Sequence, residues 1–252
     1  MGSPSAGVSV TDAVSAAPRA PRHAGVVRAT HWITTAAVLA LLVSGAEIVI
    51  SHPRFYWGDE GNVNTPALFQ LPIPASRATV PTGYDYVLPD QNGWSRSLHF
   101  EAAWALVLAG GVYAVYGLTS RHFARHLLPA RSTLRPAALA GSLAAHLRLA
   151  RPPAMEAWSY NPLQRLAYLA VIGLATPLMI WTGLAMSPAV VSAFPGAMAV
   201  FGGHQSARTL HFAATLGLVA FTLIHVTMVI RAGFVNRVRA MITGRAEGEE
   251  ER

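Results

Sequence analysis

The sequence has no cysteine among its 252 residues. That absence excludes disulfides, thiolate-bound iron–sulfur clusters and haem attached covalently through a Cys-x-x-Cys-His motif. Lysine is absent as well, so all 19 basic residues are arginine. Charged residues make up 12% of the chain, against about 25% in an ordinary soluble domain. The composition therefore argues against a soluble enzyme, and any redox cofactor must be held without cysteine.

Four apolar windows account for the low charge, because together they contain only two charged residues, Glu47 and Glu101. Each window has 21 or 22 residues. At about 1.5 Å per residue, such a helix crosses a hydrocarbon layer of about 30 Å. The windows cover residues 30 to 50, 97 to 118, 166 to 187 and 209 to 230. The sequence therefore predicts an all-α fold, an integral membrane four-helix bundle.

The arginines are distributed unevenly about these windows. Fifteen precede the first window, separate the second from the third, or follow the fourth, whereas the other two loops hold four. The positive-inside rule then places both termini and the middle loop in the cytoplasm. The net charge of +7 reflects this topology. We expect membrane lipids as partners and no nucleic acid.

The chain divides into one membrane domain and two tails. Residues 1–27 are expected to be a disordered cytoplasmic tail, residues 28–240 the transmembrane domain, and residues 241–252 a second cytoplasmic tail. The outer loop, residues 51 to 96, is long and rich in proline and aromatic residues, which makes it a candidate docking surface. Residues 136 to 150 are apolar but too few to span, so we expect them at the inner interface.

Two of the ten histidines, His211 and His225, lie 14 residues apart in the fourth window. Fourteen steps of about 100° come within about 40° of four full turns, so both rings point to nearly the same face, about 21 Å apart. An isolated membrane histidine is usually a neutral ring bonded to a carbonyl group. Here, however, one helix offers an imidazole near each surface of the membrane.

Each of these rings has a partner at its own depth. His99 follows Arg96 by three residues at the outer end of the second window, as His211 follows Arg208 in the fourth. The surrounding residues repeat as well: Arg-Ser-Leu-His-Phe at 96–100 and Arg-Thr-Leu-His-Phe at 208–212. The sequence therefore predicts an outer pair, His99 with His211.

The inner pair follows from the same comparison. His31 lies three residues past Arg28, at the inner end of the first window, and His225 lies six residues before Arg231, at the inner end of the fourth. His31 and His225 are therefore nearly level. A two-level arrangement of imidazoles fits two haems b, each bound by two histidines that act as axial ligands of the iron.

The three Arg-x-x-His units suggest a second role for arginine. Arg28, Arg96 and Arg208 stand where they could meet the propionates of such haems, or could contact lipid headgroups and set the topology. Zinc is a poor alternative, because each level offers two imidazoles without cysteine or a paired carboxylate. The distance of about 21 Å between levels also prevents all four histidines from binding one ion.

This pattern, with ligands on helices one, two and four and the His-x13-His spacing, resembles the di-haem cytochrome b subunits of bacterial respiratory complexes. These cytochrome b561-type proteins include the cytochrome b subunits of nickel–iron hydrogenase, formate dehydrogenase and thiosulfate reductase. The resemblance covers roughly residues 25 to 240. It implies a multi-pass protein of the bacterial cytoplasmic (inner) membrane. The outer loop is much longer than the short form of that family.

The resemblance also implies function. Such a subunit transfers electrons between a periplasmic catalytic redox subunit, of the molybdenum oxidoreductase or hydrogenase type, and the quinone pool. We see no independent substrate site in this sequence. The stretch Tyr-Asn-Pro-Leu-Gln-Arg at 160–165 is similar to one near the quinone site of that family. It nominates Asn161, Gln164 and Arg165 as quinone contacts.

Two alternatives stay open on the sequence. A stand-alone transmembrane cytochrome of this kind could reduce superoxide or ferric iron directly at the outer surface. In a different class, the histidines could relay protons or bind metal ions in a transporter without haem. The haem content of the purified protein distinguishes the second alternative from the others.

Overall fold

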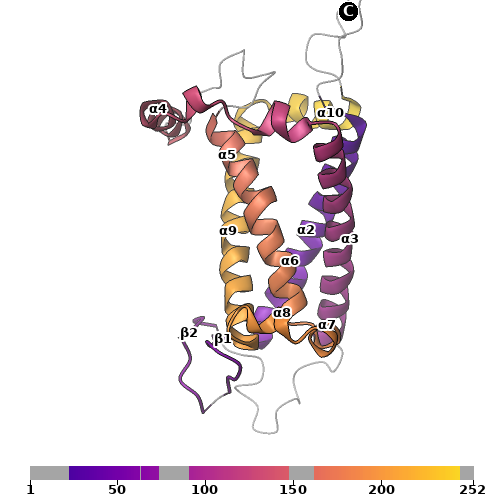
Figure 1. Ribbon diagram of the computed structural model, residues 1–252, viewed down its shortest axis with the longest axis vertical. Coiled ribbons are helices and arrows are strands. Elements are labelled where there is room, and N and C mark those ends of the chain that lie inside the picture. The colour runs from indigo at the N-terminus through magenta and orange to yellow at the C-terminus, as the bar shows by residue number, and fades with distance from the viewer. Residues whose placement is uncertain (1–22, 63, 74–90, 148–161, 245–252) are drawn as a thin grey trace, which may run out of the picture.

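A bundle of four long helices forms the body of the computed structural model, which describes residues 23–62, 64–73, 91–147 and 162–244. The first two are α2 (Gly25–Ser51) and α3 (Gln91–Thr119). The third comprises α5 (Pro162–Ala170), η4 (Val171–Ala175) and α6 (Thr176–Ala185), and the fourth is α9 (His204–Arg231). Each is long and apolar enough to cross a membrane, and Figure 1 shows all four running along the long axis. The predicted all-helical, four-span bundle is confirmed.

Short elements cover both ends of the bundle. The strands β1 (Arg54–Phe55) and β2 (Phe69–Gln70) and the helices α7 (Pro188–Ala193) and α8 (Gly196–Ala199) lie at one end, which we call the outer end after the predicted topology. The opposite, inner end carries η1 (Phe123–Leu127), η2 (Arg131–Leu134), α4 (Pro136–Leu147) and α10 (Phe234–Thr243). The apolar stretch after residue 136 is thus a separate helix at the inner end, where we expected it.

The third spanning helix changes its winding in the middle. Residues Val171–Ala175 form a π-helical turn, which is immediately followed by α6 with Pro177 in its first turn. Proline has no backbone N–H, and its ring collides with the carbonyl group four residues earlier in a regular α-helix. The wider π turn relieves that collision, so the break that Pro177 predicts takes this form.

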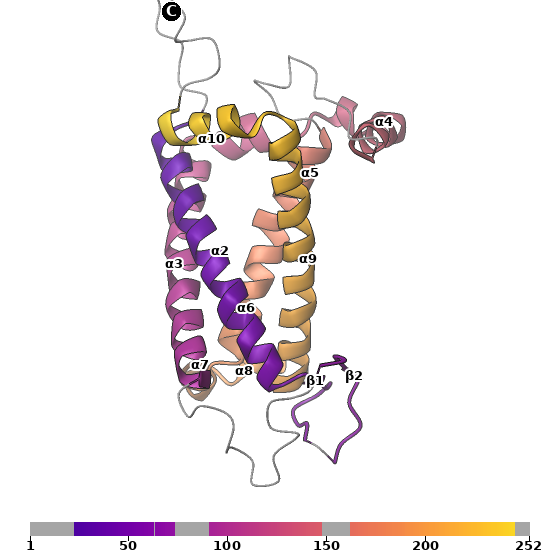
Figure 2. The same cartoon turned by 180° about the vertical axis from the view of Figure 1, so that it is seen from behind.

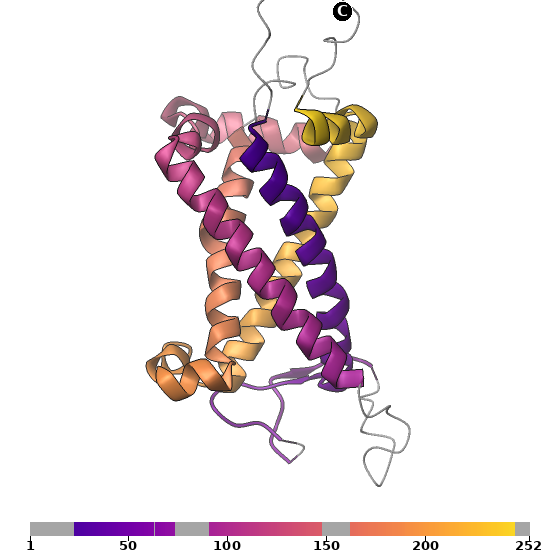
Figure 3. The same cartoon turned by 90° about the vertical axis from the view of Figure 1, so that its right-hand side faces the viewer.

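The helices α2 and α3 pack against each other through small side chains. On both helices the buried residues other than glycine recur every seven positions: Thr30, Ala37, Ser44 and Ser51 on α2, and Ser95, Ala102 and Ala109 on α3. Side chains of this size let two helix backbones approach closely, as is common in membrane bundles. Figure 3 shows α3 crossing the bundle in front of α2.

Large apolar side chains of the bundle face outward or into spaces between the helices. Leu39, Leu108 and Leu223, for example, are 59%, 67% and 64% exposed. In water such a surface would aggregate, whereas in a bilayer lipid tails cover it. The exposure pattern therefore agrees with a chain whose solvent is the membrane.

The last helix is tied to the first at the inner end. Arg28 donates through Nη1 to the carbonyl oxygen of Ile242 at 2.5 Å, and Trp32 donates through Nε1 to that of Met241 at 3.1 Å. These carbonyl groups belong to the last turn of α10, where the helix leaves its own acceptors unpaired. Figure 2 shows α10 crossing the inner end from α9 to the start of α2.

Candidate functional site

The four histidines predicted as ligands meet in two pairs. At the outer level the ring centroids of His99 on α3 and His211 on α9 lie 6.3 Å apart, with the ring planes at 57°. At the inner level the centroids of His31 on α2 and His225 on α9 lie 6.5 Å apart, also at 57°. Each pair joins α9 to a different helix, and the partners are those that their depth in the sequence predicts.

The ring separations fit a metal ion between two axial imidazoles. A metal–imidazole bond is about 2.0–2.1 Å, and the ring centroid lies about 1.2 Å behind the nitrogen, so two opposed rings place their centroids about 6.4 Å apart. Both pairs come within about 0.1 Å of that value. In the described part of the chain, no three His, Asp or Glu side chains gather into a metal site. Two ligands per level suit a planar metal cofactor better than a bare ion.

Hydroxyl groups hold both rings of the outer pair. Oγ of Ser44 on α2 lies 3.0 Å from Nδ1 of His99, and Oγ1 of Thr182 on α6 lies 2.8 Å from Nδ1 of His211. In both rings the engaged nitrogen is Nδ1, which leaves Nε2 for a metal. Thus α6, which has no histidine, still takes part in the outer site through Thr182.

Sequence reasoning did not predict Ser44 and Thr182. A signal for them exists, because each hydroxyl residue is followed by a glycine: Ser44-Gly45 on the first helix and Thr182-Gly183 on the third. A methyl group added at Gly45 would lie 3.5 Å from Cε1 of His99, and one at Gly183 would lie 3.6 Å from Cε1 of His211. The two hydroxyl–glycine steps thus repeat on helices one and three, as Arg-x-x-His repeats on helices two and four.

Aromatic rings surround the inner pair. Phe221 stacks on His225 with centroids 5.8 Å apart, and Tyr168 on α5 meets the same ring edge-on at 6.3 Å. Trp32 packs edge-on against His31 at 5.3 Å. Nδ1 of His31 is buried without a hydrogen-bond partner within the described residues. The inner pair therefore lies in apolar surroundings, unlike the hydroxyl-bonded outer pair.

The three arginines predicted as propionate contacts have different environments. Besides its bond to α10, Arg28 has a buried Nε for which the described residues supply no acceptor. The side chain of Arg96 is exposed. Arg208 donates to the carbonyl oxygens of His52 and of Arg54, the latter at 3.0 Å. Arg28 therefore retains a donor near the inner pair, whereas Arg208 holds the outer loop.

The strands β1 and β2 pack on α9 beside the outer histidine pair. Phe55 stacks on Phe69 with centroids 4.7 Å apart and packs against Phe212, the residue after His211, at 4.4 Å. The Arg208 guanidinium lies 4.8 Å from the Phe55 ring centroid, close enough for a cation–π contact. An aromatic series thus leads from the half-exposed Phe69 to the residue next to an outer histidine.

Backbone bonds fix the same loop to the start of α9. The amide of Gly58 donates to Oγ of Ser206 at 2.7 Å, and the amide of Gln205 donates to the carbonyl oxygen of Gly58 at 2.9 Å. The hydroxyl of Thr209 donates to the carbonyl oxygen of Tyr56 at 2.7 Å. The segment after α2 therefore forms a fixed cover over the outer end of α9.

The residues nominated as quinone contacts lie partly within the described structure. Gln164 and Arg165 are half-buried in the first turns of α5, at the inner end, and Asn161 lies outside the described residues. Nη1 of Arg165 donates to the carbonyl oxygen of Leu128 at 3.1 Å. Tyr168, one turn after Gln164 on the same face, packs on His225. The start of α5 is therefore connected to the inner pair through one aromatic ring.

A second histidine cluster lies at the inner end, away from the paired rings. His122 and His126 face each other with centroids 4.7 Å apart, and Tyr113 and Tyr116 flank His122. Partial burial, together with the neighbouring His126, lowers the pKa of His122. His122 is therefore largely neutral at pH 7.

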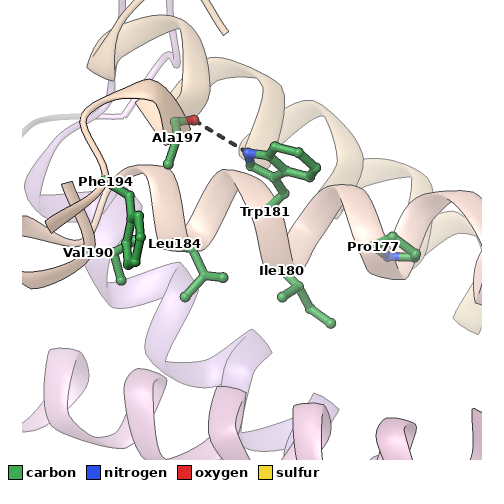
Figure 4. Close-up of a pocket in the computed structure, with 7 residues that line it drawn as sticks. All are labelled: Pro177, Ile180, Trp181, Leu184, Val190, Phe194 and Ala197. Atoms are coloured by element: carbon green, nitrogen blue, oxygen red, sulfur yellow. Dashed lines mark hydrogen bonds between the residues drawn. The ribbon is translucent and has the colours of Figure 1, made fainter. Parts of the chain in front are cut away.

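An apolar groove of about 460 Å³ runs along the outer half of α6 (Figure 4). Trp181 closes one side and donates through Nε1 to the carbonyl oxygen of Ala197 at 3.3 Å. The lining residues are Pro177, Ile180, Trp181, Leu184, Val190, Phe194 and Ala197. No titratable side chain is among these lining residues.

Comparison with known proteins gives a match over most of the chain. Residues 22–244 match the family model described as prokaryotic cytochrome b561. The chain is 28% identical over 207 residues to an Azospira oryzae protein whose name assigns it to a protein-methionine-sulfoxide reductase as subunit YedZ1. That match covers 82% of this chain and 89% of the relative. No solved structure matches the chain. The family match includes all four spanning helices and both histidine pairs.

Proposed function

The chain belongs to the prokaryotic cytochrome b561 family, and from this premise we propose that it holds two haems b, one at each level of the bundle. Membership makes it a membrane electron-transfer subunit of a redox complex that carries b-type haem. We assign His99 and His211 as the axial ligands of the outer haem, and His31 and His225 as those of the inner haem. The observation that carries this assignment is the pair of ring separations, 6.3 and 6.5 Å.

The side chains have separate tasks in this proposal. When bound, haem b supplies a one-electron carrier at each level. The imidazoles hold the iron, while the apolar spanning helices exclude water from the space between the two levels. Within the described residues Nε of Arg28 has no acceptor, so it could bind an inner propionate, and the exposed side chain of Arg96 could bind an outer one. Arg208 supports the outer site indirectly, through the loop that it holds.

The electron partners follow from the two ends of the bundle. At the inner end we propose a quinone site at Asn161, Gln164 and Arg165. At the outer end we propose that a periplasmic catalytic subunit docks on the strands β1 and β2. The name of the Azospira oryzae relative, a protein-methionine-sulfoxide reductase subunit, favours a reductase over a hydrogenase as that partner. Electrons then pass from quinol at the inner end to the catalytic subunit at the outer end.

The haem content tests the proposal most directly. We expect two non-covalent, low-spin haems b per chain in a pyridine haemochrome assay, both extracted by acid–acetone because no cysteine tethers them. The variant His122→Ala serves as the control and should keep both haems, because its ring lies outside the two pairs. One haem per chain contradicts the two-level assignment, and none favours the transporter alternative.

A variant at the start of α5 tests the quinone site. Each lost hydrogen bond to the quinone costs about 1 kcal/mol, so Asn161→Ala combined with Gln164→Ala should weaken quinone binding by about tenfold or more. The measurement is the rate of haem reduction by a quinol at varied concentration. Both haem spectra should stay intact, and Asn236→Ala, which removes an exposed amide at the same end on α10, should have no effect. An unchanged quinol dependence in the double variant disproves the assignment.

A further inference from the structure

The two outer histidines share a feature that the inner ones lack. Each is contacted by a hydroxyl–glycine step on the spanning helix that precedes its own: Ser44-Gly45 on α2 for His99, and Thr182-Gly183 on α6 for His211. The glycines lie against the rings, where an added methyl group would be in ordinary van der Waals contact at 3.5 and 3.6 Å, and the hydroxyl groups reach Nδ1 at 3.0 and 2.8 Å.

Binding of a metal through Nε2 would fix the direction of these hydrogen bonds, because the neutral imidazole then carries its proton on Nδ1. Oγ1 of Thr182 also lies 2.7 Å from the carbonyl oxygen of Leu178, which can only accept, so the single hydroxyl proton is used there. The hydroxyl oxygen is therefore able to accept the Nδ1–H proton of His211 while it donates its own proton to that carbonyl group. Ser44 repeats this geometry, because its Oγ lies 2.7 Å from the carbonyl oxygen of Ala40. Both outer sites thus suit the Nδ1–H tautomer with a bare Nε2, the form that binds a metal.

The inner rings have no such arrangement in the described structure. Nδ1 of His31 is buried without a partner, and the nearby hydroxyl of Thr35 donates to the backbone carbonyl oxygen of His31 at 2.8 Å instead. Around His225 the neighbours are aromatic rings, Phe221 and Tyr168. The two levels therefore offer the same pair of ligands with different hydrogen bonding.

Hydrogen bonding of this kind changes the ligand strength of an imidazole. When Nδ1–H donates to an acceptor, the ring gains partial negative charge and its Nε2 becomes a stronger donor to the metal. A stronger donor stabilises ferric iron, which carries one more positive charge than ferrous iron, and this lowers the reduction potential. Two such bonds would act on an iron held by the outer pair, whereas the described residues supply no acceptor to Nδ1 of His31.

We propose that Ser44 and Thr182 are positioning residues that orient the outer histidines and lower the reduction potential of the outer haem relative to the inner one. This inference rests on the haem assignment made above. It also accounts for the repeated pattern in the sequence. The antiparallel pairs α2 with α3 and α6 with α9 each supply one hydroxyl group and one histidine, so α6 contributes to the outer site although it provides no ligand.

The test is a redox titration of the purified, haem-containing variants Thr182→Val and Ser44→Ala. We expect the midpoint of the outer component to rise in each variant and further in the double variant, with the inner midpoint and the low-spin spectra unchanged. The outer component is identified as the one lost in His99→Ala. Thr182→Ser, which keeps the hydroxyl, should restore the parent midpoint. Thr222→Val is the matched control on α9, since the Thr222 hydroxyl donates to the carbonyl oxygen of Leu218 at 2.8 Å.

Each outcome decides the inference. An outer midpoint that stays unchanged in both single variants, or that shifts together with the inner midpoint, overturns it. If Thr182→Val loses the outer haem, retention in Thr182→Ser supports the role of the hydroxyl and loss in both overturns it. A parent protein without two haems would instead refute the proposed function, so the two failures are distinguishable.

Discussion

Replacing either member of a histidine pair by alanine should remove one and the same haem. His99→Ala and His211→Ala are expected to abolish the outer component, and His31→Ala and His225→Ala the inner one. Loss of an axial imidazole leaves a buried iron under-coordinated, whereas the other level, about 21 Å away along α9, shares no ligand with it. Electron flow between quinol and the partner should stop in all four variants, because a single remaining haem leaves too wide a gap for tunnelling.

Redox titration of the four single variants measures this pairing, with His122→Ala as the control that keeps both components. Loss of the same component from His99→Ala and His225→Ala, with His211→Ala sparing it, would show that the pairing is wrong. The ring centroid distances of 6.3 and 6.5 Å would then not reflect the bound state.

The second large effect is expected at the junction between the outer loop and α9. Gly203 has φ of +125°, which other residues rarely adopt, and a methyl group there would overlap the backbone of Gly58 and Asp59. The strain alone costs about 1–3 kcal/mol. Gly203→Ala should therefore release the loop from Ser206 and open it roughly 30-fold more often, for a local cost of about 2 kcal/mol.

Limited proteolysis of the loop after α2 measures this opening, and the rate of haem oxidation by the partner should fall with it. Gly202→Ala is the matched control. That residue also has a positive φ, +74°, but a methyl group there would meet no atom within 4 Å. A loop that stays as protected in Gly203→Ala as in Gly202→Ala would refute the proposed overlap with Gly58.

The spanning helices were predictable because one physical requirement dominates them. A stretch of about 20 apolar residues has few alternatives to a membrane helix, and the family match confirms the resemblance drawn from the histidine spacing. The ends were less predictable. The helix α9 begins at His204 rather than near residue 209, because polar residues such as Gln205 and Ser206 continue the helix beyond the apolar window.

The histidine pairing was predictable from depth, whereas the hydroxyl contacts were not. Many serines and threonines in this bundle donate to the carbonyl oxygen four residues earlier, as Thr215 and Thr222 do. This hydrogen bond is common for serine and threonine in any helix, so it does not mark a functional site. Whether such a hydroxyl also reaches a ring depends on how two helices are rotated against each other. The sequence carries no local record of that rotation, although the repeated hydroxyl–glycine step at Ser44 and Thr182 hints at it.

The arginines show the same limit. The three Arg-x-x-His units look equivalent in the sequence, yet Arg208 is engaged by carbonyl groups of the outer loop and Arg96 is exposed. Those carbonyl groups come from residues more than 150 positions earlier in the chain. Only the folded arrangement distinguishes an arginine that holds a loop from one that remains free to meet a cofactor.

The position of α9 as the last of the four spanning helices has a consequence for biogenesis. Since α9 supplies one ring to each pair, neither level is complete until the final span has left the ribosome and entered the bilayer. The bonds from Arg28 and Trp32 to α10 close the inner end later still. If the four histidines bind haem as proposed, loading must follow synthesis of nearly the whole chain, and a nascent chain stalled before α9 would carry no bis-histidine haem at either level.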